Sequence, residues 1–147
     1  MNVVNLTQHL STTEQQAEGV FDLPEGLREK LVKALTFSAD YSRDDLEAAA
    51  EAIIEIVKEI DCYRAMVGGM PAFMAPLERA LIEAGVTVGY ARSERVSVDQ
   101  VQADGTVRKT AIFKHVGMYW ASERMFACCY CGSAKCIAYT HGESICG

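Results

Sequence analysis

The chain has 147 residues and a mass of 16.1 kDa, which is enough for one domain with a hydrophobic core. Half of its residues are apolar and 23% are charged, a balance that excludes disorder over most of the chain. No apolar run reaches the roughly 18 residues of a membrane span, and the N-terminus lacks the pattern of a signal peptide. We therefore expect a cytoplasmic protein without a membrane partner.

The net charge of −6 comes from 14 basic and 20 acidic residues. Long nucleic acids are bound chiefly through contacts between phosphates and basic side chains, so we expect no partner of that kind. The charge is divided unevenly, since residues 1–85 carry 7 basic and 15 acidic groups and residues 86–147 carry 7 basic and 5 acidic groups. An anion-binding surface is expected toward the C-terminal half or on backbone N–H groups.

Apolar periodicity and turn signals divide the chain into short strands and helices. Ser11 with Glu14, and Ser42 with Asp45, have the spacing of a capping box, which marks a helix start. Pro76 predicts a kink or a later start in the helix that contains it. In chain order we expect a strand at 3–6, a helix from Ser11 to Gly19, a strand at 20–23, helices at 25–35 and 43–60, a strand at 63–67, a helix at 71–84, a strand at 86–90 that runs into a polar stretch with period-2 alternation, an Asp-Gly turn at 104–105 and a strand at 107–119.

This alternation predicts an α/β fold of the Rossmann-like kind, with a mostly parallel sheet of about five strands. The expected strand order is 2-1-3-4-5, and the last two strands form a C-terminal antiparallel hairpin. Residues 1–120 would form a nucleotide-binding domain, and residues 121–147 a Cys- and His-rich tail.

Open α/β sheets bind ligands at the carboxyl ends of their strands, beside the point where the strand order reverses. In the expected order this point lies between the first and third strands. The residues that follow those two strands are Thr7, Gln8 and His9 in one loop and Gly68, Gly69 and Met70 in the other. Backbone N–H groups in a glycine turn that leads into a helix suit a phosphate. Two polar strand ends with a structural glycine turn are the alternative interpretation.

His9 is the candidate for acid–base chemistry, because imidazole can take up and release a proton near neutral pH. A capping or solvent-facing histidine is the alternative. Arg92, Ser93 and Lys114 are further candidates for contact with an anionic ligand. Charges that keep an exposed edge strand from aggregating are an equally good interpretation of these residues.

The tail places Cys131, Cys136, His141 and Cys146 at intervals of five residues. Three thiolates and one imidazole match a tetrahedral zinc site, which would be closed and structural. Free thiols and disulfides are the alternatives. No metal or other cofactor is expected to take part in catalysis.

Two segments carry a resemblance to known proteins: NVVNLTQHLSTTEQQAEGVFDLP at residues 2–24, and the stretch from VGGMPAFM to FKHVGM at residues 67–118. They resemble small proteins common in bacteriophage and mobile-element genomes and the stand-alone CRISPR-associated ring nucleases. Those proteins share a Rossmann-like fold of the CARF kind and tend to form dimers. The Cys-rich tail has no counterpart in them.

The resemblance implies recognition of a cyclic oligoadenylate, a second messenger of antiviral defence, with or without cleavage. In cleavage, a ribose 2′-OH attacks the neighbouring phosphate without a metal. His9 would donate a proton or bind phosphate, Thr7 and Gln8 would position the ribose, and the amides around Gly68 and Gly69 would hold phosphate. A homodimer would present these groups twice to a symmetric ring. The alternatives are a non-catalytic sponge for the same nucleotide and an interaction module that docks through a zinc-bound tail.

Overall fold

The computed structural model describes residues 2–121, 139–140 and 143–144. In chain order its elements are β1 (Val3–Asn5), α1 (Thr13–Ala17), β2 (Val20–Phe21), α2 (Glu25–Leu35), α3 (Arg43–Ile60), β3 (Arg64–Val67), α4 (Pro71–Glu83), β4 (Thr87–Val101), β5 (Val107–Trp120), β6 (Tyr139–Thr140) and β7 (Glu143–Ser144). None of the described helices is long and apolar enough to cross a membrane.

The main sheet has five strands in the order β2-β1-β3-β4-β5, which confirms the predicted fold class and strand order. The first four strands are parallel, with Val4 paired to Phe21 on one side and to Ala65 on the other. The fifth strand, β5, runs antiparallel to β4. The chain reverses direction across the sheet between β1 and β3, where the expected binding site lies. β6 and β7 pair separately with each other.

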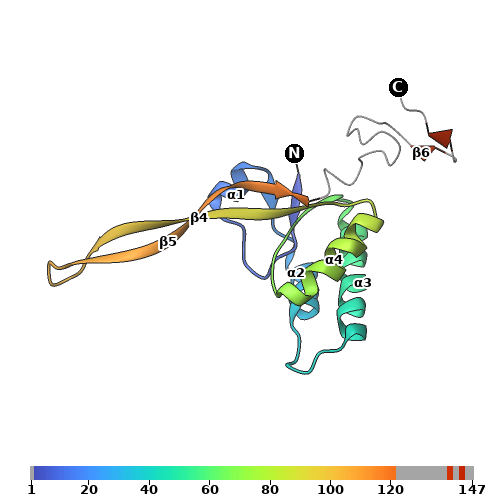
Figure 1. Ribbon diagram of the computed structural model, residues 1–147, viewed down its shortest axis with the longest axis horizontal. Coiled ribbons are helices and arrows are strands. Elements are labelled where there is room, and N and C mark those ends of the chain that lie inside the picture. Colours follow the sequence, from blue (N-terminus) through green and yellow to red (C-terminus); the bar gives the residue numbers. More distant parts are fainter. Residues whose placement is uncertain (1, 122–138, 141–142, 145–147) are drawn as a thin grey trace.

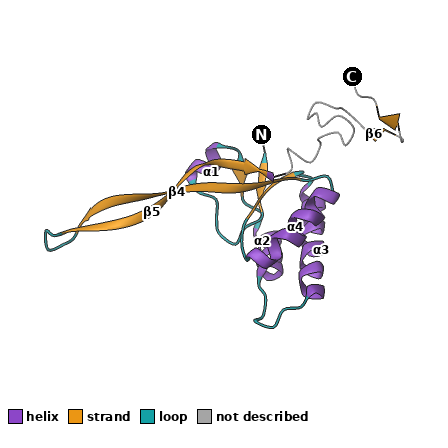
Figure 2. Ribbon diagram, in the orientation of Figure 1, coloured by secondary structure: helices purple, strands orange, loops and turns teal. Residues whose placement is uncertain are grey.

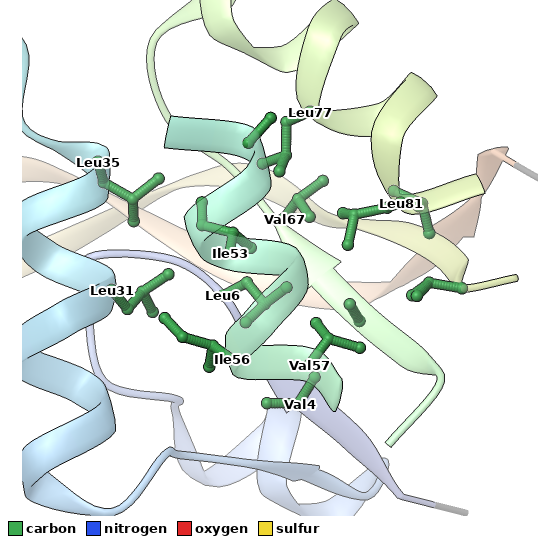
Figure 3. Packing of buried hydrophobic residues seen from close by; sticks show 14 of the residues in the cluster. Val4, Leu6, Leu31, Leu35, Ile53, Ile56, Val57, Val67, Leu77 and Leu81 are labelled. Carbon is green, nitrogen blue, oxygen red and sulfur yellow. The ribbon is translucent and has the colours of Figure 1, made fainter. Parts of the chain in front are cut away.

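Helices α2, α3 and α4 cover one face of the sheet (Figures 1 and 2). Strand residues that point to this face meet the apolar sides of the helices, as Figure 3 shows for the packing around Leu6 and Ile53. The central members are almost fully buried: Val4, Leu6, Leu31, Ile53, Ala65, Leu77, Leu81 and Val88. Burial of this apolar surface is the main stabilising contribution to the fold.

The opposite face of the sheet carries a smaller apolar cluster. Val3, Val20 and Met66 are buried there, with Met118 and Trp120 of β5 packed against them. The Arg64 guanidinium lies 4.4 Å from the centre of the Trp120 ring, a cation–π contact that ties β3 to the end of β5. Helix α1 also lies on this side of the sheet (Figure 1).

The predicted capping box at Ser42 is confirmed, since its hydroxyl accepts from the Asp45 N–H and the Asp45 carboxylate accepts from the Ser42 N–H. The prediction that Ser11 starts α1 is wrong by one residue. Thr12 is the cap and Gln15 its partner, with N–H···O distances of 3.3 and 2.9 Å. The Ser11 side chain is engaged elsewhere, because its hydroxyl donates to Asp22 and accepts from the Gln16 side-chain amide.

Helices α2 and α3 have the predicted bounds, and Gly19 follows α1 with the positive φ of 94° that favours glycine. Helix α4 begins at Pro71 and continues through Pro76 without interruption. The second strand ends at Phe21, two residues earlier than expected, because Asp22 turns to bond Ser11.

The fourth strand continues far beyond Tyr90 and pairs with β5 over its whole length, from Gly89 with Trp120 to Val101 with Val107. A bulge at Arg92 and Ser93 leaves Val116 unpaired and interrupts the register. The expected Asp-Gly turn joins the strands, with Gly105 at φ 82° and the Asp104 carboxylate accepting from Thr106. Beyond the bulge the two strands project from the body of the molecule (Figure 1). We refer to residues 93–101 and 107–115, with their turn, as the arm.

Candidate functional site at the strand ends

A pocket of about 320 Å³ opens at the carboxyl ends of β1 and β3, next to α1. The loop after β1 and the loop after β3 both line it, as the strand-end rule predicts. A Cβ atom placed on Gly68 would lie 3.5 Å from Thr7 Cγ2, so the two loops lie side by side with room for no more than a methyl group between them at this point. The lining residues are Thr7, His9, Leu10, Thr12, Gln15, Met66, Val67, Gly68, Tyr90 and Ala91.

The loop after β1 is held by Asn5, a buried polar residue at the end of that strand. Its side-chain amide donates to the His9 carbonyl at 2.8 Å and to Asp22 Oδ1 at 2.7 Å. Its carbonyl oxygen accepts from the Thr7 N–H at 3.0 Å and from the Thr7 hydroxyl at 2.7 Å. These four bonds satisfy the buried Asn5 side chain and fix the path of residues 5–9.

Asp22 extends this network toward α1. Burial would raise the pKa of its carboxyl, but the hydrogen bonds from Asn5 and from the N–H and hydroxyl of Ser11 outweigh burial and lower that pKa. The Arg28 guanidinium lowers it further, and the same side chain donates to the Gln8 carbonyl at 2.7 Å. An ionised Asp22 therefore stabilises the loop after β1 through its hydrogen bond from Asn5.

Backbone donors are available on both sides of the pocket. Among the described residues, none accepts a hydrogen bond from the N–H groups of His9, Gly68 or Gly69. Gly69 has a φ of 150°, a conformation that favours glycine, and α4 begins two residues later at Pro71. Free N–H groups beside a helix N-terminus form a favourable environment for an anion.

Tyr90 of β4 forms another wall of the pocket. Its hydroxyl donates to Glu78 Oε2 of α4 at 2.7 Å. Burial, followed by the hydrogen bond and the charge of Glu78, raises the pKa of Tyr90 well above its ordinary value of 10.0. The hydroxyl therefore stays protonated and holds the Tyr90 ring against α4, where the ring packs on the main core.

Three of the predicted site residues, Thr7, His9 and Gly68, come together in the pocket, and the others lie elsewhere. The Gln8 side chain donates to the Leu35 carbonyl at 3.3 Å, which directs it toward α2. Gly69 and Met70 form the turn into α4, and Met70 packs against the main core.

Arg92, Ser93 and Lys114 lie at or beyond the bulge where the arm begins. Ser93 pairs with His115, whose Nε2 is 2.8 Å from Glu18 Oε1 and joins the base of the arm to α1. Lys114 is opposite Glu94 on the other face of the arm.

The proposed zinc ligands Cys131, Cys136, His141 and Cys146 lie outside the described residues. No metal-binding group of His, Cys, Asp or Glu occurs within the described residues.

Three larger grooves lie on the outer helical layer. One, of about 660 Å³, lies between α2 and α3, a second, of about 560 Å³, lies between α3 and α4, and a third, of about 490 Å³, lies along α2. Alanines and the separated charged side chains of exposed helix faces form much of their walls. The smaller strand-end pocket has the stronger claim to function, because a histidine, two threonine hydroxyls and free amides converge there.

The sequence analysis missed several residues that shape this site, chiefly Asn5, Asp22 and Tyr90. Asn5 did leave a signal, because an amide in the apolar run Val3-Val4-Asn5-Leu6 must be either exposed or hydrogen-bonded. The partnership of Tyr90 with Glu78 left none, since it depends on how α4 crosses β4.

The sheet order and the pocket define an open α/β protein of Rossmann-like topology with a strand-end site. The chain belongs to the family described as "Uncharacterized protein MJ1673 family", whose profile matches residues 1–119. Comparisons with curated proteins and with solved structures found no match to it.

Proposed function

We propose that the strand-end pocket binds one nucleotide unit of a cyclic oligoadenylate-type second messenger and that the protein cleaves this ring. The observation that carries the proposal is the convergence of Thr7, His9 and Gly68 on one pocket. Imidazole and backbone N–H groups can donate to a phosphodiester, and the Thr7 hydroxyl, whose proton goes to Asn5, can accept from a ribose hydroxyl. Within the described chain no Lys or Arg lines the pocket, so neutral donors and His9 would carry the recognition.

Cleavage of the ring needs no metal and little covalent chemistry from the protein. The ribose 2′-oxygen attacks the adjacent phosphorus and loses its proton, while the bond from phosphorus to the 5′-oxygen breaks. The products are a 2′,3′-cyclic phosphate and a 5′-hydroxyl. His9 would give its proton to the leaving 5′-oxygen, and the N–H groups of Gly68 and Gly69 would stabilise the charge on the phosphate oxygens.

The size of the pocket favours one nucleotide per chain, because about 320 Å³ is at the lower end of the range for ligand sites. Two copies of the site would engage two opposite nucleotides of a four-nucleotide ring. A homodimer with two-fold symmetry would supply them. The expected role is control of a defence signal in the cytoplasm, as a counter-defence protein or a signal regulator.

The test is to incubate the purified protein with cyclic tetra-adenylate in the presence of a metal chelator and to separate the products by chromatography. We expect linear products ending in a 2′,3′-cyclic phosphate, and a loss of at least about a hundredfold in rate for His9→Ala. Lys33→Ala, in the groove between α2 and α3, is the control and should cleave like the wild type.

Intact ring recovered after tight binding would instead make the protein a sponge and remove the catalytic part of the proposal. Absence of both binding and cleavage would contradict the nucleotide assignment as a whole. A His9→Ala variant that cleaves normally would exclude His9 from the mechanism.

A further inference from the structure

The arm exposes apolar side chains that a stable two-stranded ribbon would not leave in water. Beyond the contact of His115 with Glu18, no other described element packs on it (Figure 1). An isolated two-stranded hairpin is only marginally stable, so we expect a binding partner to pack against a ribbon of this length. Phe113 is 75% exposed, Val101 72% and Val107 62%, which places three of the four most exposed large apolar residues of the described chain on the arm.

Those three residues share one face of the arm. Paired residues of an antiparallel ribbon point to the same side, and sides alternate along each strand. His115 is bonded to Glu18, next to α1, so its row marks the side that we name the α1 face. The rows of this face are Ser93 with His115, Arg95 with Phe113, Ser97 with Ala111, Asp99 with Lys109 and Val101 with Val107.

The α1 face is complementary to itself. A two-fold axis that crosses the strands at the row of Ser97 and Ala111 brings a second arm face to face and antiparallel to the first. Arg95 then lies opposite Asp99 of the second copy, and Phe113 lies opposite Lys109 of the second copy. The first pair is of opposite charge and the second is a cation over an aromatic ring, and each occurs twice.

The small side chains of Ser97 and Ala111 lie at the axis, where the two ribbons must approach closely. Val101 and Val107 at the tip of each arm come to the row of Ser93 and His115 in the other, where Glu18 already covers the His115 side chain, so each tip meets the end of the partner's α1. The two bodies then lie at opposite ends of the paired arms.

The opposite face of the arm lacks this complementarity. It carries Glu94 with Lys114, Val96 with Ile112, Val98 with Thr110 and Gln100 with Arg108. The same two-fold operation on that face would set Lys114 against Arg108 of the second copy, which is repulsive. The net charge of −6 also disfavours a nucleic acid as the binding partner of the arm.

We propose that the arm pairs through its α1 face with the arm of a second copy of this chain, forming an antiparallel two-fold dimer. The inference deepens the proposed function, which calls for a two-fold homodimer, by naming the interface, and it depends on no nucleotide. The dimer brings each tip to the base of the partner arm, next to Ala91 and the strand-end pocket.

Charge reversal tests the pairing by sedimentation velocity over a range of protein concentrations, without nucleotide. Arg95→Glu alone sets Glu against Asp99, and Asp99→Arg alone sets two arginines against each other. We expect each variant to raise the dissociation constant of the dimer by about tenfold or more. A mixture of the two variants restores opposite charges at both contacts, so we expect it to form mixed dimers with an affinity close to that of the wild type.

Two matched variants serve as controls on the opposite face. Arg108→Glu makes the same charge change as Arg95→Glu, and Ile112→Ala truncates an apolar side chain as Phe113→Ala does. We expect both controls to dimerise like the wild type and Phe113→Ala to be weakened. A wild-type chain that stays monomeric would overturn the proposal, whether or not it binds duplex DNA through the arm. Single variants that do not recover on mixing, or controls that disrupt the dimer equally, would also overturn it.

Discussion

Asn5 Nδ2 donates a 2.7 Å hydrogen bond to Asp22 Oδ1, which joins the end of β1 to the residue that follows β2. The same Asn5 side chain holds Thr7 and the His9 carbonyl. One buried amide therefore connects the sheet, the base of α1 and the loop that carries the candidate catalytic histidine.

Replacing Asn5 with alanine should destabilise the protein by about 2 kcal/mol, because it removes the hydrogen bonds that the Asn5 side chain makes with Thr7, the His9 carbonyl and Asp22. Asn2→Ala, the same change at an exposed position before β1, should cost less than about 0.5 kcal/mol. Urea unfolding followed by circular dichroism measures both values. Equal stability of the two variants would show that the network does not hold the loop.

Asp22 should make the stability of the protein fall in acid. Its pKa is lower in the folded chain than its ordinary value of 3.8, so the ionised carboxylate stabilises the fold above that value and loses its contribution as the pH falls through the lowered pKa. The difference in free energy of unfolding between wild type and Asp22→Asn should therefore shrink from about pH 6 to about pH 2.

The comparison with Asp22→Asn separates this residue from Asp45 and Asp104, whose pKa values hydrogen bonds also lower. A difference that stays constant across this pH range would contradict the assignment of the acid sensitivity to Asp22.

Gly89 is required for the packing of Trp120 against the sheet. A Cβ atom at Gly89 would lie 2.7 Å from Trp120 Cε3, and the ring is also held by Arg64. Gly89→Ala should cost about 1–3 kcal/mol through overpacking and change the Trp120 fluorescence. Gly26→Ala, in α2 with no atom within 4 Å of the new methyl group, should be neutral or stabilise by up to about 1 kcal/mol. Thermal unfolding of both variants decides the point.

The zinc interpretation of the tail makes a quantitative prediction. Protein purified without chelator should contain one zinc ion per chain by elemental analysis, and Cys136→Ser should lose it. Cys62→Ser, which changes a free thiol between α3 and β3, should keep the metal. Protein that contains no zinc, and whose tail thiols all react with a thiol reagent, would leave free cysteines as the correct interpretation.

The sequence predicted the helices and the sheet order well because their signals are local. Leucines at helical spacing and the Ser42–Asp45 box set the bounds of α2 and α3, and the alternation of elements restricts the strand order. The two loops of the pocket were predictable as well, since carboxyl ends of neighbouring parallel strands must share one edge of the sheet.

The rest depends on contacts between distant residues. Ser11 had the right spacing for a cap but forms hydrogen bonds with Asp22 instead. The Gln8 side chain donates to the Leu35 carbonyl at the end of α2. The length of β4 beyond Tyr90 was only partly predicted, because the alternation at Val96 and Val98 indicates a strand but the polar residues around them leave its bounds open. A one-residue bulge at Arg92 then decided which side chains of the arm share a face.

The most direct test of the account is a map of amide chemical shifts in ¹⁵N-labelled protein as cyclic tetra-adenylate is added in a metal-free buffer, with His9→Ala to suppress turnover. We predict that the largest changes occur at Thr7, at the alanine that replaces His9, and at Gly68 and Gly69, around the strand-end pocket. Saturating changes confined to the groove between α2 and α3, or no changes at all, would contradict a nucleotide site at the ends of β1 and β3.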